Sequence, residues 1–397
     1  ARPAPKGRAG VTVAATVIAD EAGLAQLAPE WDALAAAVGE PIASPAWILA
    51  WWRHVAPDDA QPRVVAVRDR DALIGVAPFY VRGEAAAATY RPMADDFSSN
   101  VALLAARDRI WDVAAATATA LAEAAPRPAA LAPLSAGAPW GAAFADTWPG
   151  RLRPRTVRLR QEDSATVAID GAFDVWLARR GAQFRKAVRK RARAFERAGG
   201  RMRLATRATI ERDVAAFVEL HAARWDGRGE SRLLALGDRL PRLLLDIAGG
   251  VAGEERLRLW IAEIDGQPIG ADLSLVAGGE IVGVNTGWDE AWRRLAPVQL
   301  LTVHKLQDAF ARGEGRLHMG WGSLSYKRAF ADGNDPVAWD LLLPVGRDLP
   351  RAAGRAAPAI VRARARDGLT RALPPERTEQ LLALRRRVLA RRQRPRP

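Results

Sequence analysis

Residues 256–288 read RLRLWIAEIDGQPIGADLSLVAGGEIVGVNTGW, and they indicate the kind of fold more clearly than any other part of the sequence. The stretch contains three apolar runs of strand-forming composition. Asp265-Gly266 and Gly278-Gly279 separate the runs, and glycine supplies the positive φ angles that tight hairpin turns require. The sequence therefore predicts a three-strand antiparallel meander. Its strands are expected at 256–264, 268–276 and 280–288.

The segments on either side of this meander alternate between helical and strand patterns. A strand and two helices are predicted before it, and a helix and a strand after it. These elements are the strand 202–207, the helices 210–225 and about 238–249, the helix 297–312 and the strand 316–320. Strand, two helices, three-strand meander, helix and strand is the order of the GNAT fold. We therefore expect an α/β protein, of the α+β kind with a mixed sheet.

The first half of the chain repeats part of this plan. The segment 64–78 resembles 259–273 in its strand, acidic turn and Ile-Gly step, which favours a duplicated unit. The alternative is that any two hairpins share such features. Strands are also expected at 11–18, 63–67, 72–81, 129–134, 155–160 and 165–170, and helices at 24–38, 45–55, 111–124 and 173–198.

The composition excludes several kinds of site. The chain has no cysteine, which excludes disulfides, thiolate metal ligands and a cysteine nucleophile. Its four histidines lack the spacing of a zinc enzyme, so we expect no metal. No apolar run approaches the ~20 residues that span a bilayer, and the start ARPAPKGRAG lacks the apolar core of a signal peptide. The sequence therefore predicts a cytoplasmic protein.

The net charge of +14 is concentrated at the end of the chain. Residues 351–397 contain 14 arginines and three acidic residues, whereas the rest of the chain is nearly neutral. This distribution does not favour a nucleic-acid partner. The segment 376–392 predicts a helix with apolar residues on one side and arginines elsewhere. Such a helix fits binding to an anionic membrane surface, at the inner face of the membrane, or to an acidic protein; a frayed end is the alternative.

Seven segments carry a more specific resemblance. They are SPAWILAWW (44–52), LIGVAPFY (73–80), QFRKAVRKRAR (183–193), LHAARW (220–225), GQPIGADLS (266–274), NTGWDEAWRRLAPVQLL (285–301) and SYKRAF (325–330). In this order and spacing the chain resembles the CelD/BcsL family. Those proteins are GNAT-type acyltransferases associated with cellulose and exopolysaccharide biosynthesis, and they are related to the FemAB enzymes with paired GNAT domains. The resemblance spans about residues 25–343.

The resemblance implies tandem GNAT folds in one chain. It implies an N-terminal GNAT-like domain at 11–170 and a C-terminal GNAT domain with the acyl-CoA site at 171–346. The charge distribution adds a basic helical tail at 347–397. The resemblance also implies transfer of an acyl group from acetyl-CoA or another acyl-CoA to an amino or hydroxyl group. The acceptor would be a small molecule or glycan, such as a sugar or polysaccharide precursor, and would attack the thioester directly.

A loop that runs into the helix 297–312 is the candidate cradle for the CoA pyrophosphate. Free N–H groups and the helix dipole attract phosphate at a helix N-terminus. GNAT enzymes commonly carry glycines in this loop, and this chain lacks them. The loop consists of Arg293, Arg294, Leu295, Ala296, Pro297 and Val298. An arginine-rich solvated helix start is the alternative. The fold would bind the oxyanion through the splayed strand 280–287, where Asn285 adds an amide that could instead cap a turn.

A general base has three candidates. His221 is the first, because imidazole titrates near neutral pH, and its alternative is a packed histidine. Asp272 interrupts an apolar strand, and burial there would raise its pKa, although strand alternation could turn it to solvent. Asp289 follows the meander directly. All three therefore stay open as bases.

Four residues are candidates for the acceptor site. Arg224 and Trp225 lie beside His221 at the end of a predicted helix. Tyr326 and Lys327 could bind the acceptor or donate a proton to the leaving thiolate, and a surface position is the alternative for each. The family often has Asp-Phe before its Tyr-Lys, whereas this chain has His318-Met319.

Two other functions compete with acyl transfer from CoA. One is a non-catalytic GNAT pair that docks at a membrane-associated polysaccharide synthase through its basic tail. The other is a FemAB-like transferase that takes its acyl group from aminoacyl-tRNA. In that case the basic helix predicted within 179–197 would hold the RNA, although a solvated helix is the default interpretation.

Overall fold

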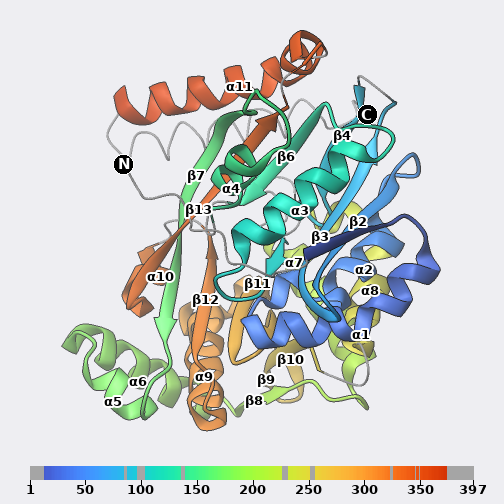
Figure 1. Cartoon of the computed structure of the whole chain (residues 1–397). Coiled ribbons are helices and arrows are strands. Elements are labelled where there is room, and N and C mark those ends of the chain that lie inside the picture. The colour runs from blue at the N-terminus through green and yellow to red at the C-terminus, as the bar shows by residue number, and fades with distance from the viewer. Residues whose placement is uncertain are drawn as a thin grey trace, which may run out of the picture.

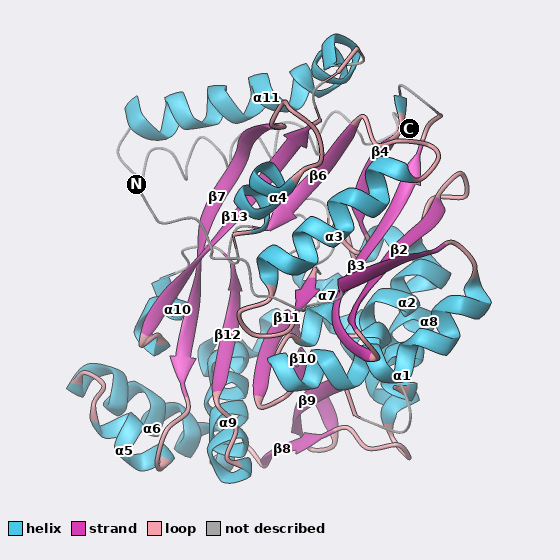
Figure 2. Cartoon of the chain, in the orientation of Figure 1, coloured by secondary structure: helices cyan, strands magenta, loops and turns pink. Residues whose placement is uncertain are grey.

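The computed structural model shows a mixed α/β protein built on one large sheet (Figures 1 and 2). It describes residues 13–84, 87–95, 103–135, 139–225, 231–250, 255–321, 325–344, 346–347 and 349–372. Within these residues the strands follow the order β1-β2-β3-β4-β6-β13-β7-β12-β11-β10-β9-β8, and β5 pairs with β3.

The strands range in length from two residues in β5 to 14 in β7. They are β1 (Val13–Ile18), β2 (Gln61–Asp69), β3 (Ala72–Arg82), β4 (Thr89–Pro92), β5 (Leu104–Ala105), β6 (Ala130–Ser135), β7 (Arg155–Ala168), β8 (Gly200–Leu204), β9 (Leu257–Ile264), β10 (Gln267–Ala277), β11 (Glu280–Trp288), β12 (Arg316–Trp321) and β13 (Gly333–Leu343).

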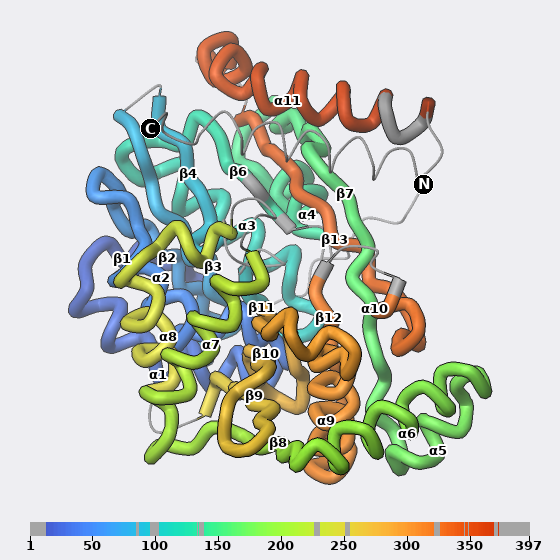
Figure 3. Tube along the Cα trace, turned by 180° about the vertical axis from the view of Figure 1, so that it is seen from behind, coloured from blue at the N-terminus to red at the C-terminus, as the bar shows by residue number. Residues whose placement is uncertain are grey.

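Helices cover both faces of the sheet. They are α1 (Glu21–Val38), α2 (Pro45–Val55), α3 (Ile110–Glu123), α4 (Trp140–Thr147), α5 (Phe173–Ala178), α6 (Ala182–Arg197), α7 (Ile210–Trp225), α8 (Arg239–Gly249), α9 (Pro297–Arg312), α10 (Ser325–Phe330) and α11 (Leu349–Ala372). Val64 and Ala66 of β2 pack with α1, α2, α7 and α8, whereas Val65 and Val67 pack with α3 and α4. Because successive strand residues face opposite sides, the two helix groups cover opposite faces, as Figures 1 and 3 show.

The two halves of the chain share strands at the centre of the sheet. β13, from the second half, lies between β6 and β7 of the first half. β7 in turn pairs with β12 of the second half along Ser164–Ala168 and with β13 along most of its length. Each half thus completes its part of the sheet with a strand that the other half contributes.

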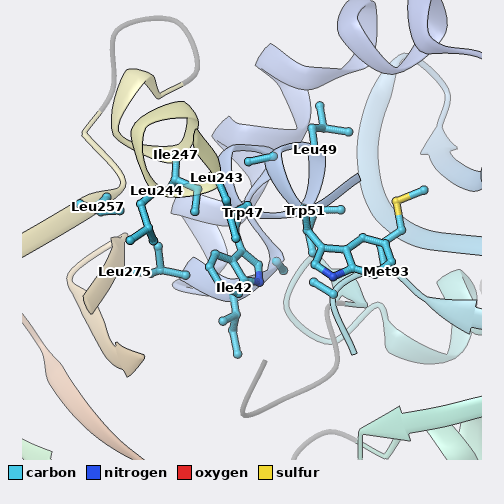
Figure 4. Packing of buried hydrophobic residues seen from close by; sticks show 14 of the residues in the cluster. Ile42, Trp47, Leu49, Trp51, Met93, Leu243, Leu244, Ile247, Leu257 and Leu275 are labelled. Carbon is cyan, nitrogen blue, oxygen red and sulfur yellow. The ribbon is translucent and has the colours of Figure 1, made fainter. Parts of the chain in front are cut away.

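The halves also share a hydrophobic core. Trp47 and Trp51 of α2 are fully buried and pack in one cluster with Leu243 and Leu244 of α8 and with Leu275 of β10 (Figure 4). Beside this cluster the buried guanidinium of Arg256 donates to both carboxylate oxygens of Asp32 in α1, at 3.0 and 2.6 Å. The two halves therefore form a single packing unit around this core.

Most of the predicted elements are confirmed, and two are corrected. The strands expected at 155–160 and 165–170 are one continuous strand, β7, because pairing with β13 holds the intervening residues extended. The single helix expected over 173–198 is two helices, and the chain leaves helical geometry around Gly181, the N-cap of α6. β13 was not expected, since Pro336 interrupts its sequence and proline argues against a central strand.

The described part of the tail is α11, which packs on β7 and β13 through Leu349, Ala352 and Ile360. The helix expected at 376–392 lies outside the described residues. Among the residues that the structure describes, no helix has the length and apolar character to cross a membrane.

Candidate functional site

Strands β11 and β12 separate at the centre of the candidate site. Their parallel pairing covers only 280–282 and 316–318. On its other side β11 pairs with β10 through Leu273 and Asn285 and then through Ser274 and Gly283, so Val284 is an extra residue in a β-bulge. The bulge bends β11 away from β12 and opens the sheet between them. The expected splay of 280–287 is therefore present in the structure.

A polar cavity of about 130 Å³ lies at this opening, and we call it the transfer cavity. The bulged segment Gly283–Thr286 forms one wall, and α9 and α10 contribute side chains opposite it. Five residues singled out from the sequence line it together: Arg224, Asp272, Asn285, Tyr326 and Lys327.

Asp272 has a buried cationic partner in this cavity. Lys305 Nζ of α9 lies 2.6 Å from Asp272 Oδ1, and the Ser274 hydroxyl donates to the same oxygen at 3.1 Å. Both side chains of the ion pair are at most 5% exposed. The alternation of β10 thus turns Asp272 toward α9 and away from solvent, and the partner fixes its carboxylate in place.

Lys327 and Tyr326 have shifted pKa values at the same place. Burial, together with the nearby charges of Arg224 and Lys305, lowers the pKa of Lys327 to about 8, although Glu162 opposes the shift. Lys327 Nζ donates to the Gly320 carbonyl at 3.0 Å. Burial and the charge of Asp272 raise the pKa of Tyr326 to about 12. Near neutral pH Tyr326 therefore keeps its proton, and Lys327 loses its proton more readily than an exposed lysine does.

A second cavity of about 280 Å³ adjoins the first at the start of α9, and we call it the loop cavity. Arg293, Ala296, Pro297 and Val298 of the predicted loop line it, together with Trp288 and Gln299. Arg224 and Tyr326 line both cavities, so the two form neighbouring parts of one site.

The loop 293–298 contains no glycine, but one of its residues has a backbone conformation that favours glycine. Ala296 adopts φ 52° and ψ 62°, in the left-handed region, and Pro297 begins α9 directly after it. The first turn of α9 carries no acidic residue. Arg191 of α6 donates to the Gln299 side chain beside this turn, which adds a further cation. The first turn of α9 therefore lies in a positively charged environment that favours the binding of an anionic group.

His221 lies behind the transfer cavity rather than in its lining. Its Nδ1 donates to the Thr286 carbonyl at 3.1 Å, and its Nε2 lies 2.8 Å from the Ser231 hydroxyl. The side chain is fully buried, which lowers its pKa. Arg224 donates to the same Thr286 carbonyl at 2.9 Å. His221 thus holds the bulged strand in position, while its role as a base stays a prediction.

The remaining sequence candidates lie outside both cavities. Asp289 accepts from the Ala291 N–H at 2.9 Å and caps the short helix 290–295. Arg294 is exposed, and Leu295 packs on the cluster around Trp260. Trp225 packs against the His221 ring, 6.1 Å between centroids. None of these residues lines either cavity, so the roles expected for them stay predictions.

Sequence reasoning missed three polar residues that line the transfer cavity: Thr286, Thr302 and Lys305. Lys305 interrupts the apolar face that Leu301, Leu306 and Ala309 give to α9, and this interruption is the signal that could have identified it. Among the described residues, no group of three or more histidine, aspartate or glutamate side chains could hold a metal ion.

Comparisons with known proteins agree with this geometry. Residues 182–328 match the family model described as an acetyltransferase (GNAT) domain, and this range contains all the described residues that line the two cavities. No curated protein sequence matches the chain.

Three solved structures share the fold at low sequence identity. FemX has a TM-score of 0.54 and 9% identity, over 78% of this chain and 93% of that one. The C-terminal domain of a lysylphosphatidylglycerol synthetase from Agrobacterium fabrum has a TM-score of 0.51 and 11% identity, over 84% and 96%. A protein of unknown function from Bacteroides thetaiotaomicron has a TM-score of 0.52 and 10% identity, over 81% and 97%. The chain therefore has the GNAT acyltransferase fold.

Proposed function

We propose that the protein is an acyltransferase that moves an acyl group, acetyl in the simplest case, from acyl-CoA to an amino or hydroxyl group. The observation that carries this proposal is the meeting of the two cavities at Arg224 and Tyr326. One cavity offers a cationic helix start for a phosphate chain, and the other offers polar and titratable groups beside a bulged strand. Together they meet the requirements of acyl transfer from a thioester.

The loop cavity fits the phosphate end of acyl-CoA. Arg293 and the first turn of α9 supply positive charge and helix-terminal N–H groups. The start of α3, a helix that follows the β2–β3 hairpin in the first half, is unsuited to this role. There Arg109 is bonded to Asp112 and Asp69, at 2.6 and 3.1 Å, and Asp112 lies in the first turn of α3. A carboxylate at that position repels phosphate, which supports the second half as the CoA-binding copy.

We assign a residue in or beside the transfer cavity to each step of the acyl transfer. Lys327, in its neutral form, accepts the proton of the attacking amine or hydroxyl. The bulged segment and the Asn285 amide, whose oxygen accepts from the Thr286 N–H at 3.0 Å, are the groups that we assign to the developing oxyanion. Tyr326 donates its proton to the thiolate when the carbon–sulfur bond breaks, because it lines both cavities. Asp272 and Lys305 orient the acceptor, and His221 positions Thr286.

The acceptor that we propose is a sugar or polysaccharide precursor, as the resemblance to the CelD/BcsL family implies. The small volume of the transfer cavity, about 130 Å³, favours an acceptor that inserts a single amino or hydroxyl group from outside. The basic tail then serves to hold the enzyme at an anionic surface, where such precursors are used.

A thiol-release assay tests the proposal directly. The chain contains no cysteine, so a thiol reagent reports free CoA without a background from the protein. Acetyl-CoA is incubated with glucosamine, with glucose or with no acceptor. We expect acceptor-dependent thiol release, slowed at least about a hundredfold by Lys327→Gln, which removes the base.

The matched control is Lys190→Gln, an exposed lysine of α6, which should leave the rate unchanged. Acetyl-CoA that binds without turnover with any acceptor would favour the non-catalytic alternative. Salt-sensitive tRNA binding that requires α6, with no affinity for acetyl-CoA, would favour the aminoacyl-tRNA donor.

A further inference from the structure

A group of arginines surrounds a third cavity, which lies beneath α11 and shares no lining residue with the loop cavity. This cavity has a volume of about 420 Å³, and we call it the arginine cavity. Its floor comes from β4, β6, β7 and β13, and α11 forms its roof, as the position of α11 over these strands in Figures 1 and 3 illustrates. Six arginines line it: Arg91, Arg160, Arg232, Arg355, Arg362 and Arg366.

The charge of this lining is strongly unbalanced. Among the described residues that line it, Asp95 is the one acidic residue, and it is paired with Arg91. Burial lowers the pKa of Arg160; Glu162 opposes this shift, and the positive charges of Arg366 and Arg232 add to it. Like charges gathered around a partly enclosed space repel one another, and a bound anion relieves this repulsion.

The α11 side of the cavity leaves space for a ligand. Between its arginines, α11 presents small side chains, including Ala356, Ala359 and Ala363. On the sheet side the Arg160 guanidinium is held 4.8 Å from the centre of the Trp339 ring. The cationic groups are thus arranged around an open volume, and two of them, on α11, are spaced one helical turn apart.

Two connections link the arginine cavity to the transfer cavity. Arg160 forms an ion pair with Glu162, and the charge of Glu162 acts on Lys327 in the transfer cavity. Arg232 directly follows Ser231, whose hydroxyl bonds His221, and His221 in turn bonds the carbonyl of Thr286. A molecule bound in the arginine cavity would therefore contact residues that are linked, through Glu162 and Ser231, to the groups proposed for transfer.

We propose that the arginine cavity binds the phosphate or pyrophosphate group of the acceptor, so that the acceptor is a phosphorylated sugar rather than a neutral one. The identification of the ligand as the acceptor rests on the proposed function, whereas the anion site itself does not depend on it. Planar guanidinium groups bind phosphate in bidentate geometry, and several around one cavity recognise more than one phosphate oxygen at once. The phosphate can belong to a soluble sugar phosphate or to a lipid-linked one.

Isothermal titration with inorganic pyrophosphate tests the anion site. The test variant is the double change Arg362→Gln with Arg366→Gln. Both side chains are exposed on α11, so the fold should tolerate the change. The control is Arg351→Gln with Arg364→Gln, which removes the same charge from exposed positions of α11 outside the cavity lining. We expect the Kd for pyrophosphate to rise at least about tenfold in the test variant and less than about twofold in the control.

Two results would overturn the anion site. Equal weakening of pyrophosphate binding in the test and control variants would mean that the net charge of the protein, and not the arginine cavity, determines the affinity. Binding that is lost with Arg293→Ala but kept in the test variant would place the anion at the start of α9. Titration with acetyl-CoA is run in parallel, so a failure of the arginine cavity can be told apart from a failure of the proposed function.

Transfer assays then test the link to the acceptor. With glucosamine 6-phosphate we expect a KM at least about tenfold lower than with glucosamine, and we expect the test variant to abolish this difference with little change in kcat. A KM difference that persists in the test variant would contradict the proposal. Sedimentation with phosphatidylglycerol vesicles distinguishes the two sources, because binding that needs Arg362 and Arg366 indicates a lipid-borne phosphate.

Discussion

Lys305 and Asp272 form a buried ion pair, 2.6 Å between Nζ and Oδ1, that joins α9 to the meander at the centre of the candidate site. The pair lies where β11 leaves β12, and both of its residues line the transfer cavity. It therefore affects both the local packing and the electrostatics of this cavity. A pair of this kind contributes little net stability compared with apolar residues, but breaking it leaves one charge buried without its partner.

Asp272→Asn should therefore destabilise the protein strongly. We expect the free energy of unfolding, measured in urea, to fall by about 3–5 kcal/mol. Glu30→Gln is the control, because Glu30 pairs with Arg68 at 2.7 Å on the surface, and its loss should cost less than about 1 kcal/mol. Similar losses in the two variants would mean that the Lys305–Asp272 pair is solvated.

The rate of acyl transfer should depend on the ionisation of Lys327. Only the neutral amine can accept a proton, and the pKa of Lys327 is lowered to about 8. The rate at saturating acetyl-CoA should therefore rise with pH and level off above about pH 8, with Arg224, Lys305 and Glu162 as the charged groups that set the midpoint. The pH profile of Lys327→Gln should lack this rise. A wild-type rate that is constant from pH 6 to about pH 9 would exclude Lys327 as the base.

Gly278 should resist substitution more than other glycines of positive φ. A Cβ added there would lie 1.9 Å from the Ala36 carbonyl oxygen of α1. Gly313 also has a left-handed backbone, but nothing lies within 4 Å of its added Cβ. We expect Gly313→Ala to cost about 1 kcal/mol through backbone strain alone, and Gly278→Ala to cost a further 1–3 kcal/mol, about the range for overpacking. Equal melting temperatures for the two variants would contradict the close contact between the β10–β11 turn and α1.

Ala296→Gly should stabilise the protein, which is unusual for this change. Ala296 has φ 52°, where glycine avoids about 1 kcal/mol of steric cost. Ala25→Gly, in the exposed side of α1, should instead lose about 1 kcal/mol, because glycine is unfavourable within a helix. The melting temperatures should move in opposite directions. A fall for both variants would show that the loop does not hold Ala296 in the left-handed region.

The second half of the fold could be predicted well from the sequence. The meander, α7 and α9 were predictable because apolar periodicity and glycine turns specify them locally. β13 could not be predicted, since it depends on pairing with β6 and β7, which lie far away in the sequence. The sharing of β7 and β13 between the two halves has the same cause, because strand order is a long-range property.

The candidate site was predictable in part. Asp272 was singled out because it interrupts an apolar strand, and Tyr326 and Lys327 because they lie in a segment of the resemblance; all three line the transfer cavity. The partner of Asp272 was missed, since Lys305 lies 33 positions away and their contact depends on how α9 packs on β10. His221 was singled out for its chemistry, but sequence alone could not reveal that Ser231 and Thr286 occupy both ring nitrogens.

The most direct test of the account is the affinity for acetyl-CoA of the wild type and of two neighbouring variants. Both Arg293 and Arg294 are exposed, but Arg293 lines the loop cavity and Arg294 does not, so the two arginines form a matched pair. We expect the wild type to bind acetyl-CoA, Arg293→Ala to weaken binding at least about tenfold, and Arg294→Ala to change it less than about twofold. Absence of binding in the wild type, or equal effects of the two variants, would contradict an acyl-CoA site at the start of α9.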